Sequence, residues 1–137
     1  MKIKLFFFSM CFITLFGLGG CRNFSLKNKG QDFVKVTDLS NHKTHTTYGK
    51  SNVKKVFASS TDYDALHKKS VPVWAKKKFR YAIHYSKHDM TIKILIYSNY
   101  KYAKISGVPL VGNGLLRLND TQFHDLNNPN SLFKKWL

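Results

Sequence analysis

The chain contains no glutamate, and its seven acidic residues are all aspartates. Against them stand 23 lysines and arginines, of which only three are arginine, so the formal net charge is +16 over 137 residues. Chemistry that needs two carboxylates with separated pKa values, such as glycoside hydrolysis, has few candidates here. Most of the aspartates lie in sequences typical of turns and helix caps, which explains them without catalysis.

Long apolar runs are also scarce. The one long run, Leu5 to Leu18, follows Lys2 and Lys4. It is shorter than the roughly 20 residues that a membrane-spanning helix needs, and it has the length of the apolar core of a signal peptide. Its end reads Leu18-Gly19-Gly20-Cys21.

Residues 1–21 resemble the signal peptide and lipobox of bacterial lipoproteins. An aliphatic residue, Leu18, stands three positions before the cysteine, and the small residues Gly19 and Gly20 follow it. The resemblance implies cleavage before Cys21, a diacylglyceryl group on its thiol, and often a further acyl chain such as palmitate on the new amino group. Two or more acyl chains anchor a protein stably. The alternative is an uncleaved helical anchor with a chance cysteine.

The resemblance also implies an organisation and a location. Residues 1–20 are expected to be removed, residues 21–30 to tether the protein to lipid, and residues 31–137 to form one small domain. We expect the protein outside the cytoplasm, on the cell membrane or the outer membrane. In lipoproteins of bacteria with two membranes, an aspartate after the lipidated cysteine retains the protein at the inner membrane. Because this chain has Arg22 at that position, the resemblance implies the outer membrane in such a host.

The mature chain would have 117 residues, a formal charge of +14 and Cys21 as its one cysteine. It could form no internal disulfide, so its stability must come from packing. So strong a charge favours anionic partners with salt-dependent affinity. Outside the cytoplasm these are phospholipid headgroups, lipopolysaccharide, teichoic acids or DNA in transit, and not cytoplasmic nucleic acid. An AT-rich genome would also raise the lysine content.

Alternating apolar residues predict an α+β fold, with a small antiparallel β-sheet and two or three short helices. The strongest signal is a β-hairpin over 79–98, with its turn at 87–89 and its second strand central in the sheet. A helix over 74–83 remains an alternative. The other expected elements are strands at 32–38, 53–58 and 100–106, a loop at 39–52, helices at 59–69 and 120–126, a turn at 112–114 and a last turn capped by Ser131.

The densest basic cluster contains Lys76, Lys77, Lys78 and Arg80, and Trp74 precedes it. Interleaved basic and aromatic residues suit a single-stranded nucleic acid, or a strip that contacts membrane headgroups. They equally suit a solvated strand whose aromatic residues face the core. Trp74 would be the aromatic anchor of an anionic-partner site.

Metal and catalytic signatures are weak. His42 with His45, and His84 with His88 and Asp89, have ligand chemistry, but we expect solvated side chains in lysine-rich loops. Nucleophile and phosphate-loop motifs are missing. We therefore expect no enzyme, metal or cofactor, and a lipoprotein that binds an anionic envelope polymer or a protein partner. The alternatives are a structural or pilot subunit of an envelope assembly or secretion apparatus, and an exclusion or immunity lipoprotein.

Overall fold

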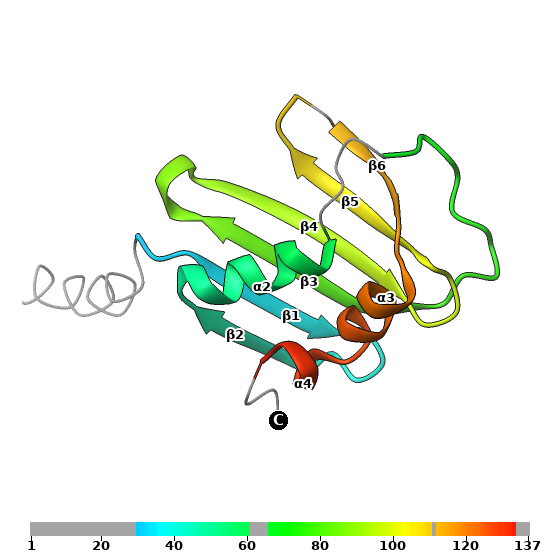
Figure 1. Ribbon diagram of the computed structural model, residues 1–137, viewed down its shortest axis with the longest axis horizontal. Helices are drawn as coiled ribbons and strands as arrows, with labels where there is room; N and C mark the ends of the chain where they lie inside the picture. The colour runs from blue at the N-terminus through cyan, green and yellow to red at the C-terminus, as the bar shows by residue number, and fades with distance from the viewer. Residues whose placement is uncertain (1–29, 61–65, 111, 134–137) are drawn as a thin grey trace, which may run out of the picture. The chain divides into compact units, whose positions relative to one another are not determined.

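The computed structural model describes residues 30–60, 66–110 and 112–133. The chain divides into two units at Gly30, and the expected signal peptide, lipobox and Cys21 lie outside the described residues. In the second unit the chain forms six strands, shown in Figure 1: β1 (Phe33–Asp38), β2 (Thr44–Tyr48), β3 (Lys77–Tyr85), β4 (Met90–Tyr97), β5 (Tyr102–Val108) and β6 (Gly112–Arg117).

The strands form one open sheet in the order β2-β1-β3-β4-β5-β6, and every neighbouring pair is antiparallel. Four of the five pairs are consecutive in sequence. The exception is β1 with β3, which are joined through β2 and the helix α2 (Lys50–Ser60). Two further helices follow the sheet, α3 (Asp120–Leu126) and α4 (Pro129–Leu132). The fold is therefore α+β, as predicted.

All three helices cover the same face of the sheet (Figure 1). Val53 and Val56, three residues apart on α2, are buried together with Leu126 of α3 against alternate strand residues. The hydroxyl group of Tyr81 on β3 donates a 2.8 Å hydrogen bond to the carbonyl oxygen of Leu126. This contact ties the end of α3 to the centre of the sheet.

The central hairpin is confirmed as β3 and β4, joined by a short 3-10 turn at Ser86–His88. The strand predicted over 32–38 is β1, the one over 100–106 is β5, and the helix over 120–126 is α3. The alternative of a helix over 74–83 is wrong. Period-two alternation buries Phe79, Tyr81 and Ile83 on one side of β3, which a helix would not do.

Several other expectations are wrong. The expected loop at 39–52 contains β2 and the start of α2, and the expected strand at 53–58 lies inside α2. The helix expected at 59–69 is absent over 66–69, where His67 instead pairs with Leu115 at the edge of β6; residues 61–65 lie outside the described part. The expected turn at 112–114 is the start of β6. Asn128, not Ser131, is the N-cap of α4, because Pro129 is well suited to the first helical position.

Within the described ranges, no helix is both long enough and apolar enough to cross a membrane.

Candidate functional site: a basic sheet face with an aromatic end

No described helix packs on the second face of the sheet, which we call the open face. Residues paired across strands share a face, so the register identifies its members. Lys35 pairs with Ala82, Arg80 with Leu95, and Lys93 with Ser106. Their sequence neighbours Val36, Tyr81 and Ile94 are fully buried on the helix side.

Four exposed cations cross the open face in a zigzag, one on each of β1, β3, β4 and β5. We call Lys35, Arg80, Lys93 and Lys104 the cation zigzag. Each cation is diagonal to the next across a strand pair. Lys35 pairs with Ala82, which is two residues from Arg80. Arg80 pairs with Leu95, two residues from Lys93, and Lys93 pairs with Ser106, two residues from Lys104. Diagonal neighbours in an antiparallel sheet are about 7–8 Å apart.

The direct cross-strand neighbours of these cations are uncharged. Lys93, for example, lies between Ala82 and Ser106, and Lys104 lies between Leu95 and Leu115. None of the described strand residues on this face is acidic. The positive charge of the zigzag is therefore not neutralised by carboxylates within the face.

Three of the four cations surround a depression of about 420 Å³. Arg80, Lys93 and Lys104 line it, and the shorter side chains of Ala82 and Ser106 lie between them. The depression forms because Ala82 and Ser106 have shorter side chains than the cations around them. An anionic group that settled there would meet cations from three strands.

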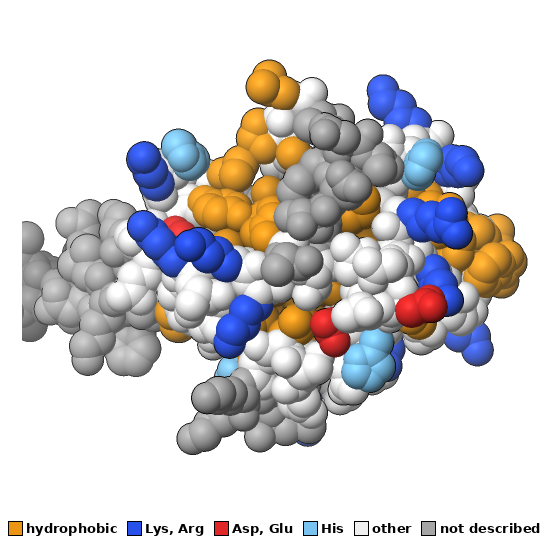
Figure 2. Space-filling view, viewed as in Figure 1, with side chains coloured by type: hydrophobic (Ala, Val, Ile, Leu, Met, Phe, Trp, Pro, Cys, Tyr) orange, Lys and Arg blue, Asp and Glu red, His pale blue; other side chains and the backbone are white. Residues whose placement is uncertain are grey.

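None of the described aspartates projects from a strand onto the open face. Asp89, in the turn between β3 and β4, borders that face, with its carboxylate 3.9 Å from the ring of the open-face residue His84. The carboxylate of Asp32 accepts hydrogen bonds from the backbone and hydroxyl of Ser86, which lower the pKa of Asp32. The pKa of Asp38 is lowered chiefly by the Ser40 hydroxyl, and that of Asp120 by Lys101. Figure 2 shows the helix-bearing face, where lysines are scattered and some acidic groups are visible.

The four residues of the basic cluster at 76–80 do not lie together on one surface. Arg80 joins the zigzag, and Lys77 pairs with the open-face residue Tyr97. Lys78 lies at an irregularity of β3, and its ammonium group donates a 3.3 Å hydrogen bond to the carbonyl oxygen of Asn127 on the helix side. Lys76 is exposed in the loop before β3.

Trp74 belongs to an aromatic group at one end of the open face. This residue is 60% exposed, and its ring meets Tyr100 edge-on at 5.4 Å between centroids. Tyr100 stacks on Tyr102 at 4.8 Å. We call Trp74, Tyr100 and Tyr102 the aromatic ladder. Beneath it Tyr97 is almost completely buried, and this burial, with Tyr100 close by, raises the pKa of the Tyr97 hydroxyl.

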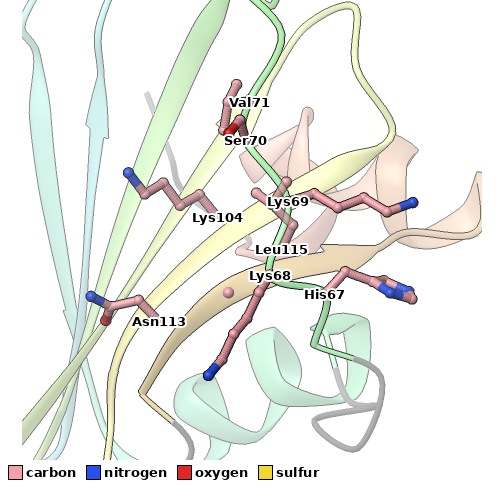
Figure 3. A pocket seen from close by; sticks show the side chains of 9 residues that line it. His67, Lys68, Lys69, Ser70, Val71, Lys104, Asn113 and Leu115 are labelled. Carbon is pink, nitrogen blue, oxygen red and sulfur yellow. The ribbon is translucent and has the colours of Figure 1, made fainter.

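A second depression, also about 420 Å³, lies between the segment at 67–71 and strands β5 and β6. Lys68, Lys69 and Lys104 line it, but Figure 3 shows their ammonium groups pointing in different directions. This arrangement does not converge on one anion. We therefore place the candidate site on the zigzag.

Among the histidines that the sequence offered as metal ligands, His84 contacts other residues of the β3–β4 hairpin. Its ring nitrogens lie 3.1 Å from the Thr91 hydroxyl and 3.9 Å from an Asp89 carboxylate oxygen. No group of three or more metal-ligating side chains occurs in the part of the chain that the structure describes.

Comparison of the chain with protein-family models, with curated proteins and with solved structures finds no match. The sequence does carry a trace of the zigzag, because Lys35, Lys93 and Lys104 each stand between two apolar residues. That pattern shows that each lysine faces outward, but it cannot show which lysines become neighbours.

Proposed function

We propose that this protein is a lipid-anchored binding protein of a bacterial cell envelope, and that its open face binds a linear anionic polymer. The observation that carries the proposal is the cation zigzag. Four exposed cations at steps of about 7–8 Å cross four adjacent strands, and no described strand residue on that face neutralises them.

The spacing favours a polymer over a small anion. A single phosphate or carboxylate is too small to contact four cations spread over four strands. A chain of anionic groups laid across the strands would meet them in succession. Attraction between exposed charges is screened by salt, so the affinity should fall as ionic strength rises.

The anchor is a separate part of the proposal and depends on Cys21. A lipid on Cys21 and the tether at 22–30 would hold the domain at a membrane surface. A partner in the envelope would then be within reach of the open face.

The test compares two triple charge reversals that change the net charge equally. One carries Arg80→Glu, Lys93→Glu and Lys104→Glu on the open face. The control carries Lys43→Glu, Lys54→Glu and Lys55→Glu, all at exposed positions away from the zigzag. Binding of residues 21–137 to polyphosphate and to alginate would be measured by isothermal titration calorimetry at two salt concentrations.

We expect the open-face variant to bind at least about tenfold more weakly, because it loses three attractions and gains three repulsions of a few tenths of a kcal/mol each. The control should lose much less. Equal losses in both variants would show that overall charge, and not this face, determines binding. Tighter binding to anionic vesicles than to either polymer would reassign the face to a membrane.

A further inference from the structure

The aromatic ladder continues the basic face. Tyr102 and Lys104 are two residues apart on β5, so both side chains lie on the open face. Arg117 pairs with Tyr102 from β6 and adds an exposed cation beside the rings. A ligand that follows the zigzag to β5 therefore meets aromatic rings next to cations.

The loop that carries Trp74 is held in place by Asn99. The side chain of Asn99 donates a 3.0 Å hydrogen bond to the carbonyl oxygen of Trp74 and accepts a 2.8 Å hydrogen bond from the backbone amide of Lys76. The amide of Ser98 also donates to the carbonyl oxygen of Lys76. The backbone that presents the tryptophan is thus fixed before any ligand binds.

Trp74 is largely exposed, and Tyr100 and Tyr102 connect it to the cations of β5 and β6. A surface that binds charge alone does not need such a ring. The Trp74 ring offers apolar area that only a ligand with apolar faces can cover. A polyphosphate has no such face. A pyranose ring has one, because its axial C–H bonds form a flat apolar surface while its hydroxyl groups stay in water.

We infer that the polymer is an anionic polysaccharide, with acidic groups on the cation zigzag and a sugar ring against Trp74. This inference rests on the proposed function and names the ligand class. Single-stranded nucleic acid fits less well, because it stacks successive bases on successive rings. In the ladder only Trp74 is mostly exposed, while Tyr100 and Tyr102 are partly buried against each other.

The experiment removes the ring and leaves the cations. Trp74→Ala is compared with Trp74→Phe, which keeps a ring, using alginate, polyphosphate, dextran and a single-stranded DNA oligonucleotide as probes. A parallel titration follows the fluorescence of Trp74 in a Trp136→Phe background, where it is the one tryptophan. Circular dichroism checks that each variant is folded.

We expect Trp74→Ala to weaken alginate binding about tenfold, to leave polyphosphate binding unchanged and to be partly rescued by Trp74→Phe. Alginate, but not polyphosphate, should change the Trp74 emission, and uncharged dextran should bind weakly.

If Trp74→Ala leaves alginate binding unchanged while the open-face charge reversal abolishes it, the ligand class is wrong and the proposed function stands. If DNA binds more tightly than alginate and depends on Trp74, the ligand is a nucleic acid. If no polyanion binds, both proposals fail.

Discussion

Gly107 is a residue whose replacement should disturb the sheet beneath the candidate site. It lies in β5 with φ of +84°, and a Cβ there would come within 2.5 Å of the carbonyl oxygen of Thr91 on β4. Gly107→Ala therefore combines an unfavourable left-handed conformation with a clash against backbone. We expect it to lower the free energy of unfolding by about 2–4 kcal/mol, measured by urea denaturation.

Gly112 provides the matched control for this prediction. Its φ of +77° is similar, but among the described residues no atom beyond its chain neighbours lies within 4 Å of the position its Cβ would take. Gly112→Ala should therefore cost only the conformational part, about 1–2 kcal/mol. Equal losses for the two variants would mean that the approach of β5 to Thr91 does not constrain the sheet.

At the scale of elements, α3 depends on a capping box. The side chain of Asn119 accepts a 2.8 Å hydrogen bond from the amide of Gln122, whose side chain accepts one of 2.9 Å from the amide of Asn119. Asn119→Ala removes one of these partners and should cost about 1 kcal/mol in unfolding free energy. Asn128, the N-cap of α4, makes no such side-chain bond, so Asn128→Ala should cost under about 0.5 kcal/mol. The reverse order in thermal or urea unfolding would contradict this assignment of the cap.

The same scale shows how far the sequence predicts the fold. Strands with apolar residues at every second position, such as β3 and β4, were predictable, because burial of one face imposes that period. The edge strand β2, Thr44–Tyr48, has no such alternation. In α2 only Val53, Val56 and Phe57 are large and apolar, so its helical state depends on packing against the sheet.

The sequence predicts only part of the candidate site, because most of its residues are brought together by strand pairing. Arg80 and Trp74 were identified from local composition. Lys35, Lys93 and Lys104 were not, because Lys35 is 58 positions from Lys93 and 69 from Lys104, and the three become neighbours only through strand register. Register depends on how whole strands pair, which composition does not contain.

At the scale of the whole molecule, the sheet separates two tasks. One face buries the apolar residues that hold α2, α3 and α4, and the other carries cations with few constraints from packing. Substitution of the zigzag lysines should therefore change binding much more than stability. This separation lets the charge-reversal experiment be interpreted as a binding experiment.

The proposed lipid anchor on Cys21 would determine where in the cell the open face is located. Fully extended, the nine residues from Arg22 to Gly30 reach at most about 30 Å, so a lipid on Cys21 would keep the open face near a bilayer. In a bacterial host, we expect Cys21→Ser to abolish labelling with palmitate and to leave the precursor uncleaved, detected as a larger species in immunoblots. Cys11→Ser is the control, because Cys11 lies in the segment expected to be removed. A Cys21→Ser protein that still matures to the normal size and stays with the membrane would refute lipidation.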